Sequence, residues 1–238
     1  MLKALLDILF PPLCHACKAF IPCAGAVHLC AACRERMIPL GSPLCPCCGR
    51  PFATQEGIDH PCGYCLTARP PYRAARAALC FTGPTRELIH RFKYSHHVRL
   101  RRPLGFITAE RLAGFIRHVE PALIIPVPLH GKRLRQRGFN QALLLGEVLA
   151  RTWRIPLSRD NLRRMRWTEP QVTLTAAERA LNVKGAFAVR DAREIKEKRL
   201  ILVDDVYTTG STVVECVRTL LKAGAAEVCV VTVARAVD

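Results

Sequence analysis

Two adjacent carboxylates, Asp204 and Asp205, directly follow four apolar residues at 200–203. An apolar run of this length is typical of a strand buried on both faces of a parallel sheet. Thr, Gly and Ser come next, and residues 213–223 then predict a helix that ends at Gly224. Ligands of open α/β sheets bind at the carboxyl ends of strands, and the N-terminus of a helix binds phosphate. The segment therefore predicts acceptors for sugar hydroxyls beside donors for a phosphate, as a ribose 5-phosphate requires.

A strand-to-helix turn with capping hydroxyls would also contain Thr, Gly and Ser. The doubled Asp favours a site, because two carboxylates at a buried strand end repel each other and call for a ligand or a metal ion. Residues 203–212 also resemble the phosphoribosyl pyrophosphate signature of the type I phosphoribosyltransferases. By this resemblance, Asp204 and Asp205 would hold the ribose 2- and 3-hydroxyls of phosphoribosyl pyrophosphate, which binds with Mg²⁺. The 5-phosphate would lie on the next residues: Thr208, Thr209, Gly210, Ser211 and Thr212.

A second motif, at 127–141, begins at the end of another predicted strand and has four cations within six residues, Lys132, Arg133, Arg135 and Arg137. Cations here would suit a pyrophosphate leaving group, whose negative charge grows in the transition state. A solvated basic loop is the alternative and the usual outcome for such a run. Arg137 is the candidate catalytic cation, and the other candidate contacts are His130, Arg133, Arg135, Asn140 and Gln141.

A third motif, at 167–187, combines a long polar loop, a short helix and a strand. Thr175 and Glu178 form a capping box, which predicts the start of the helix. Long loops inside a compact domain are often lids over a binding site. Gln171, Arg179 and Asn182 are the candidate contacts of this lid.

Ten of the thirteen cysteines lie before residue 66, and eight of them form four Cys-x-x-Cys pairs. The gaps between successive pairs are 12, 11 and 13 residues, the spacing of tetrahedral structural zinc sites. Few large apolar residues lie between the pairs, so we expect the metal to supply much of the folding free energy. The predicted ligands of two structural zinc ions are Cys14, Cys17, Cys30, Cys33, Cys45, Cys48, Cys62 and Cys65.

Disulfides are the competing interpretation, but they require an oxidising compartment. Residues 1–10 predict a short amphipathic helix rather than a signal peptide, because Asp7 interrupts them and no small-residue cleavage site follows. The zinc ligands can pair sequentially as two ribbons, which the repetition favours, or alternately as a cross-brace. Cys23 and Cys47 break the spacing and are not predicted ligands. The remaining cysteines are predicted core residues: Cys80, Cys216 and Cys229.

The chain has 238 residues and a formal net charge of +17. Eight thiolates holding two zinc ions would add four negative charges and lower it to +13. Between residues 86 and 166, 18 Lys and Arg stand against five Asp and Glu. This basic stretch predicts a polyanionic partner such as pyrophosphate, a nucleotide or nucleic acid, with an Arg-rich proteome as the alternative. Its aromatic residues would stack on bases of single-stranded DNA or, alternatively, belong to the core: Phe92, Tyr94, Phe139 and Trp153.

Strands are predicted at 77–81, 123–127, 186–189, 200–203 and 227–233, and the main helices at 82–94, 104–117, 140–153 and 213–223. This alternation indicates a doubly wound α/β domain. Residues 69–72 are the predicted linker between a zinc-binding module at 1–68 and a phosphoribosyltransferase-like domain with a parallel sheet at 69–238. No apolar run of about 20 residues occurs, so we expect no membrane span and a cytoplasmic location.

The three motifs, behind a module of four cysteine knuckles, resemble the ComF family of competence-associated, phosphoribosyltransferase-like proteins. Segments 137–141, 170–182 and 204–212 carry the resemblance, which covers essentially the whole chain. It implies a role in DNA uptake or use, with single-stranded DNA and a DNA-uptake helicase as candidate partners. Tyr207 departs from the family pattern, in which a smaller aliphatic residue is more common.

Two functions follow as hypotheses. The first is an enzyme, a phosphoribosyltransferase (a glycosyltransferase) that binds phosphoribosyl pyrophosphate or a related phosphorylated ribose. The second is a non-catalytic binding module, in which the same phosphate site holds a DNA 5-phosphate or a nucleotide. In that case the basic face would guide single-stranded DNA.

We expect the purified protein to contain about two zinc ions per chain, because eight cysteines share one spacing. Elemental analysis of protein purified under reducing conditions measures this content. Protein without zinc, or an iron chromophore in its place, would contradict the prediction.

Overall fold

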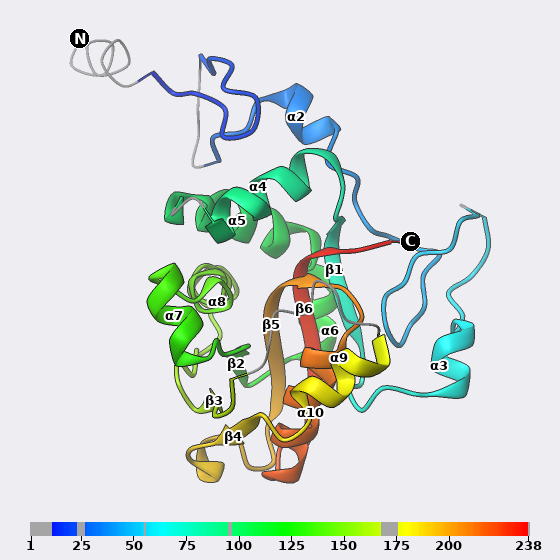
Figure 1. The fold of residues 1–238 in the computed structure, drawn as a ribbon. Coiled ribbons are helices and arrows are strands. Elements are labelled where there is room, and N and C mark those ends of the chain that lie inside the picture. Colours follow the sequence, from blue (N-terminus) through cyan, green and yellow to red (C-terminus); the bar gives the residue numbers. More distant parts are fainter. Residues whose placement is uncertain (1–10, 23–26, 55, 95–96, 168–175, 238) are drawn as a thin grey trace.

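The computed structural model describes residues 11–22, 27–54, 56–94, 97–167 and 176–237 (Figure 1). In this part of the chain, four parallel strands form the central sheet in the order β1-β6-β5-β2. The strands are β1 (Ala75–Cys80), β2 (Leu123–Pro126), β5 (Arg199–Tyr207) and β6 (Glu227–Arg235). The predicted parallel α/β sheet is confirmed.

The central strand β5 is buried on both faces, as its apolar sequence predicts. Ile201 and Val203 belong to one hydrophobic core, whereas Leu200 and Leu202 belong to the other. All four side chains are at most 1% exposed. The strand is longer than predicted, because it continues through both carboxylates to Tyr207. The two Asp residues therefore lie on a paired strand rather than in the loop that follows it.

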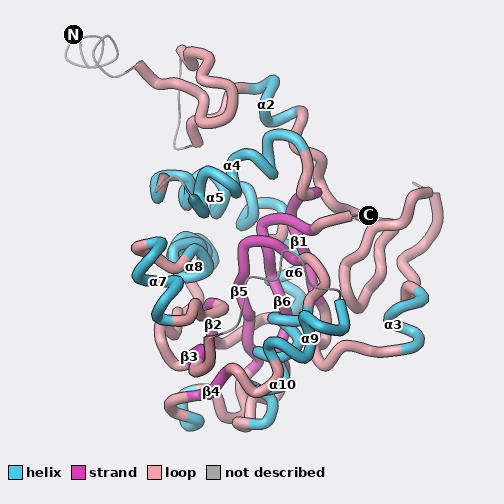
Figure 2. The backbone as a smooth tube through the Cα atoms, viewed as in Figure 1, coloured by secondary structure: helices cyan, strands magenta, loops and turns pink. Residues whose placement is uncertain are grey.

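Helices cover both faces of the sheet (Figure 2). One face carries α4 (Gly83–Tyr94), α5 (Arg101–Arg111), α6 (Ala113–Val119) and α8 (Gln141–Trp153), and the other carries α9 (Ala176–Val183) and α10 (Ser211–Lys222). Gly105 lets α5 approach α8 closely, because an added Cβ would lie 2.7 Å from Val148 Cγ1. The two cores thus meet at the sheet, in the doubly wound arrangement.

Three local features differ from the predictions. The segment predicted as one helix at 104–117 forms two helices, α5 and α6, which meet at Leu112. In α5, the Thr108 hydroxyl donates a hydrogen bond of 2.8 Å to the Leu104 carbonyl, a type of bond that often bends helices. The basic segment after β2 forms a helix, α7 (Gly131–Arg137), rather than a loop. A short strand that the sequence did not predict, β3 (Leu162–Arg164), pairs antiparallel with β4 (Phe187–Val189).

The described part of the chain also contains two short 3-10 helices, η1 (Val98–Leu100) and η2 (Ala192–Glu194).

The cysteine region forms two units, which we call the first ribbon (residues 11–40) and the second ribbon (residues 41–68). They contain the short helices α2 (Ala31–Glu35) and α3 (Gly63–Thr67), respectively. The first ribbon lies beside α4 (Figure 1), and its Cys14 and Cys33 belong to the same buried core as Leu88 and Phe92. The second ribbon joins the sheet, since the Ala75 amide of β1 donates to a ribbon carbonyl, that of Cys47, over 2.8 Å. Both ribbons are thus packed onto the α/β domain, and the boundary at residue 68 stays a prediction.

In the described ranges, every helix is too short or too polar to cross a membrane.

Candidate functional site

The carboxyl ends of β5 and β2 border a pocket of about 290 Å³, which we call the ribose-phosphate pocket. Asp204 and Asp205 line this pocket, and a smaller cavity of about 50 Å³ continues along the loop that leads into α10. Each residue of the predicted phosphate site lines at least one of these two cavities: Thr208, Thr209, Gly210, Ser211 and Thr212. Because the two cavities share Asp204 and Thr208, the carboxylates and the loop form one continuous site.

The shape of this loop requires a glycine at position 210. The φ of Gly210 is 79°, in the left-handed region, and an added Cβ would collide with Tyr207 Oη. α10 begins at the next residue, Ser211, so the free backbone N–H groups of its first turn lie at the loop. The hydroxyls of Thr209 and Ser211 lie 3.1 Å apart and share a hydrogen bond. The loop can therefore offer backbone and hydroxyl donors to one anion.

The two carboxylates are held close together in a largely buried setting. Asp205 is 7% exposed, and its Oδ1 lies 2.9 Å from the ammonium nitrogen of Lys93 in α4. Asp204 Oδ1 accepts a hydrogen bond of 2.8 Å from the Asp205 amide. Burial, followed by the neighbouring charge of Asp205, raises the pKa of Asp204 to about 7. Burial lowers the pKa of Lys93, but the contact with Asp205 outweighs it and the net pKa is raised.

Sequence reasoning missed two cations of this pocket, Lys93 and Arg164. Lys93 is four residues after Ile89, which is fully buried, so both lie on one face of α4. A lysine on the apolar face of a helix was the signal that could have identified it. Arg164 comes from the unpredicted strand β3, and its guanidinium carbon lies 5.4 Å from the centre of the Phe187 ring. The sequence carries no local signal for that placement, because the pairing of β3 with β4 creates it.

The basic motif after β2 divides into two groups. Arg133 and Arg137 line the pocket, and the Arg137 guanidinium lies 5.0 Å from the centre of the exposed Tyr94 ring. His130 instead caps α7, accepting from the Lys132 amide over 3.2 Å. Neither His130 nor Arg135 is among the residues that line the pocket. The helical form of the motif explains the division, because alternate cations of a helix cannot all face one side.

Asn140 and Gln141 follow this motif and also line the pocket. Asn140 caps α8, as predicted: its Oδ1 accepts from the Ala142 amide, and its Nδ2 donates to the Val127 carbonyl over 3.0 Å. This second bond ties the start of α8 to the end of β2. Gln141 is only 2% exposed, and within the described part of the chain its Nε2 has no hydrogen-bond partner. A buried donor of this kind favours an acceptor supplied by a ligand.

The predicted lid is described only in part. Gln171 lies outside the described residues, as does the side chain of Arg179. The carbonyl of Asn182 accepts a hydrogen bond of 2.9 Å from Arg166 Nη2.

The aromatic residues of the basic stretch mostly belong to the core. Phe92 is fully buried, and Phe139 and Trp153 pack against the same core. The Trp153 indole donates to the Ala109 carbonyl over 3.2 Å. Tyr94 differs, since it is 62% exposed. The core alternative therefore fits three of the four predicted stacking residues.

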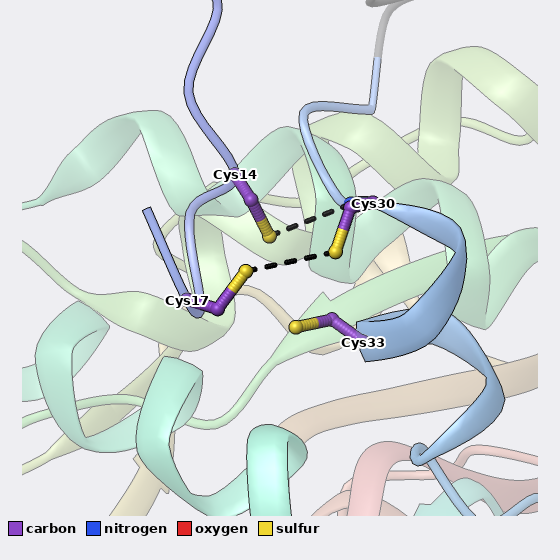
Figure 3. A group of neighbouring side chains, drawn as sticks. All are labelled: Cys14, Cys17, Cys30 and Cys33. Atoms are coloured by element: carbon purple, nitrogen blue, oxygen red, sulfur yellow. Dashed lines mark hydrogen bonds between the residues drawn. The ribbon is translucent and has the colours of Figure 1, made fainter. Parts of the chain in front are cut away.

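The eight predicted zinc ligands form two clusters, in the sequential pairing. Figure 3 shows the first, in which Cys14, Cys17, Cys30 and Cys33 point toward a common centre. The second contains Cys45, Cys48, Cys62 and Cys65, and in each cluster the sulfurs lie within 4.8 Å of one another. The Cys17–Cys30 and Cys48–Cys62 sulfur distances are 3.6 and 3.7 Å. Tetrahedral zinc with bonds of about 2.3 Å to sulfur separates its ligands by about 3.8 Å, so both donor sets fit zinc.

The same backbone hydrogen bond occurs in each of the two clusters. The Cys30 amide donates to Cys14 Sγ over 3.4 Å, and the Cys62 amide donates to Cys45 Sγ over the same distance. Burial raises the pKa of the Cys14 and Cys45 thiols, but the backbone amides around each outweigh burial and lower it to about 6. Burial raises the pKa of Cys33 to about 12 and also raises the pKa values of Cys48 and Cys65, so the fit to zinc rests on the geometry of the four sulfurs in each cluster. Cys47, which was not a predicted ligand, is in neither cluster.

A buried contact connects the second ribbon to the phosphate loop. Arg235 at the end of β6 is 8% exposed, and its Nη1 donates to the Cys48 carbonyl over 2.7 Å. Its guanidinium carbon lies 4.4 Å from the centre of the Tyr207 ring, and the Tyr207 and Tyr72 hydroxyls share a hydrogen bond of 2.7 Å. Tyr207 in turn borders Gly210 of the loop. The large side chain that departs from the family pattern thus makes contacts that a small aliphatic residue could not make.

Comparisons with protein families agree with this two-part architecture. Residues 5–66 match a double zinc ribbon domain, and residues 142–237 match a phosphoribosyl transferase domain. The parallel sheet and the second of these matches define an α/β domain with the phosphoribosyltransferase fold, in which the loop at 208–212 follows β5.

Whole-chain relatives identify the family. The chain is 35% identical to "DNA utilization protein YhgH" of Escherichia coli K12, over 92% of this chain and 94% of that protein. It is also 35% identical to "Competence protein F" of Haemophilus influenzae, over 91% and 96% of the two chains. "Competence protein ComFC" of Bacillus subtilis is 29% identical, over 83% of this chain and 80% of that protein. The chain belongs to the ComF family.

Solved structures are similar to part of the chain. Glutamine phosphoribosylpyrophosphate amidotransferase from B. subtilis, complexed with ADP and GMP, is 24% identical with a TM-score of 0.39, covering 56% of this chain and 26% of its own. Purine phosphoribosyltransferase from Pyrococcus horikoshii is 21% identical with a TM-score of 0.35, covering 54% of this chain and 71% of its own. At such low TM-scores the fold class follows from the sheet and the family match instead.

Replacing Asp204 by Asn should stabilise the protein most at about pH 8, less at about pH 5, and hardly at all below pH 3.8. The pKa of Asp204 is raised above its ordinary value, so the folded state binds an extra proton between pH 3.8 and about 7. Stability from this group is therefore present at low pH and is lost as the pH rises through that window. Thermal melting at these pH values measures the effect. An Asn variant that melts lower than wild type at about pH 8 would contradict it.

Replacing Arg235 by Met should loosen the second ribbon, because the buried Cys48 carbonyl would lose its donor. The cost should be roughly 1–3 kcal/mol, with faster loss of zinc from the second cluster to a chelator. Thermal melting and a colorimetric zinc-release assay measure the two effects. Arg193→Met is the matched control, because the Arg193 side chain is 97% exposed. Equal zinc-release rates in the two variants would show that Arg235 does not support the ribbon.

Proposed function

We propose that the ribose-phosphate pocket binds phosphoribosyl pyrophosphate or a related phosphorylated ribose. One observation carries the proposal: two carboxylates and a cluster of cations border the ribose-phosphate pocket, and the loop leading into α10 lines the smaller cavity that shares Asp204 and Thr208 with it. A sugar phosphate needs acceptors for its hydroxyls and donors for its phosphate at this spacing. A generic strand-to-helix turn would not require a repelling pair of carboxylates.

Each part of the ligand would contact a different set of residues in the pocket. Its 5-phosphate would accept hydrogen bonds from the loop at 208–212, and Asp204 and Asp205 would accept hydrogen bonds from the ribose hydroxyls. The pyrophosphate would then face Arg133, Arg137 and Lys93, which line the same pocket. The Gln141 amide, a buried donor, would find its acceptor on a phosphate oxygen.

The pocket also fits Mg²⁺ as the companion of the pyrophosphate. Hard carboxylate oxygens are the donors that Mg²⁺ prefers, and it keeps phosphate oxygens among its ligands. Burial first, and then the charge of Asp205, raises the pKa of Asp204, and a bound cation would favour its ionised form. When bound, the ion would neutralise charge on the pyrophosphate.

As an enzyme, the chain would transfer the phosphoribosyl group. The bond from the ribose C1 to the pyrophosphate oxygen breaks, and an acceptor nucleophile forms the new bond to C1. Asp204 and Asp205 would hold the ribose, and Arg137 would stabilise the charge that develops on the departing pyrophosphate. Pyrophosphate release against a panel of nucleobases tests whether this transfer occurs.

The biological role we propose is DNA uptake or use by a cytoplasmic protein. The names of the relatives, which refer to DNA utilisation and competence, support it. Binding of single-stranded DNA is the second candidate function, and the net charge of +17 favours it. A DNA-uptake helicase is a candidate partner in the same role.

Isothermal titration should detect binding of phosphoribosyl pyrophosphate in the presence of Mg²⁺. Replacing Asp204 and Asp205 together by Asn should weaken it about tenfold or more, because hydrogen bonds to charged groups are worth roughly 1.5–3 kcal/mol each. Asp191→Asn, an exposed cap of η2 outside the pocket, is the control and should bind like wild type. Unchanged affinity in a folded double variant would show that the ligand does not use these carboxylates.

A further inference from the structure

A second cavity, of about 500 Å³, lies between the first ribbon and the α/β domain. We call it the ribbon cavity. His15 and His28 come from the ribbon, and the other walls are η1, α5 and α8. It shares no lining residue with the ribose-phosphate pocket. Neither the paired carboxylates nor the phosphate loop contributes to it, so the function proposed for the pocket leaves it unexplained.

The lining of the ribbon cavity is strongly cationic. Four arginines border it: Arg99, Arg101, Arg102 and Arg151. Among the described residues that line it, Glu147 is the one carboxylate, and it is already bound by Arg101 over 3.3 Å and by Arg159 over 2.7 Å. Arg99, Arg102 and Arg151 are exposed, and no salt bridge joins them to a described carboxylate. A concave surface with this charge attracts an anion with several negative groups.

The cavity also presents ring surfaces beside these cations. The His15 and His28 rings are half-buried and stacked, with centres 5.5 Å apart and planes 24° from parallel. Phe106 of α5 lines the same cavity and is half-buried. Rings next to arginines are typical of sites that bind single-stranded nucleic acid, because the bases stack on the rings while the phosphates pair with the cations. A duplex has its bases stacked inside and cannot offer them to such rings.

The placement of the histidines is fixed by the ribbon itself. The His15 amide donates to the His28 carbonyl over 2.8 Å. His15 follows the zinc-ligand candidate Cys14 in the sequence, and the His15 carbonyl accepts from Arg91 Nη1 of α4 over 2.6 Å. This bond joins the segment that carries His15 to α4 of the α/β domain.

We propose that the ribbon cavity binds single-stranded nucleic acid, with phosphates on Arg99, Arg102 and Arg151 and bases against the histidine and Phe106 rings. The inference rests on the DNA-related part of the proposed function and is independent of the ribose-phosphate pocket. The nucleic-acid site would then not include Arg133 and Arg137, which line that pocket.

Fluorescence anisotropy with a labelled oligothymidine, titrated into the zinc-loaded full chain at several salt concentrations, tests the proposal. The triple variant Arg99→Gln, Arg102→Gln, Arg151→Gln should bind at least about tenfold more weakly. Its salt dependence should flatten by about two log units per decade of salt, since each lost phosphate contact removes about 0.7. The matched control removes the same charge at exposed arginines outside the cavity: Arg111→Gln, Arg117→Gln, Arg193→Gln.

The results distinguish a failure of the ribbon-cavity site from a failure of DNA binding as such. If the cavity variant and the control variant bind equally well, the ribbon cavity is not the site, although DNA binding itself stands. If wild type binds no oligonucleotide at low salt, both ideas fall. Arg133→Gln, Arg137→Gln should lose phosphoribosyl pyrophosphate while keeping the oligonucleotide, and the reverse result would return the site to the pocket. Equal affinity of wild type for duplex and single strand would remove the role of the rings.

Discussion

The repulsion between two adjacent carboxylates at the end of β5, one buried and one half-buried, is the constraint around which the candidate site is organised. Asp204 and Asp205 lie on a paired strand, so they cannot separate as residues of a loop could. Lys93 offsets the charge of Asp205 across 2.9 Å, whereas burial and the neighbouring Asp205 charge together raise the pKa of Asp204 to about 7. A strand end of this kind is costly without a ligand, which is why it is better explained as a binding site than as a structural turn.

The two ribbons pack onto the α/β domain through buried contacts. Cys14 and Cys33 of the first belong to the core that also contains Phe92. In the second, the Cys48 carbonyl accepts from Arg235, whose guanidinium covers the Tyr207 ring at the phosphate loop. One cluster residue, Cys14, thus precedes a residue of the ribbon cavity, and another, Cys48, contacts the support of the loop at 208–212.

The sequence predicts well what is contiguous along the chain. The carboxylates, the loop that follows them and the cysteine knuckles are all local patterns, and the structure assembles each of them. It predicts poorly what tertiary pairing brings together. Arg164 reaches the pocket because β3 pairs with β4, and three residues give no sign of that strand in a sequence. Lys93 reaches it from a helix more than a hundred residues before Asp205.

Charge along the sequence illustrates the same limit in a different way. The basic stretch between residues 86 and 166 looks like one surface in the sequence, yet its arginines border two cavities with no lining residue in common. The helical form of 131–137 turns some cations into the pocket, whereas η1, α5 and α8 present others to the first ribbon. A sugar pyrophosphate and a nucleic-acid strand therefore need not compete for the same cations in this protein.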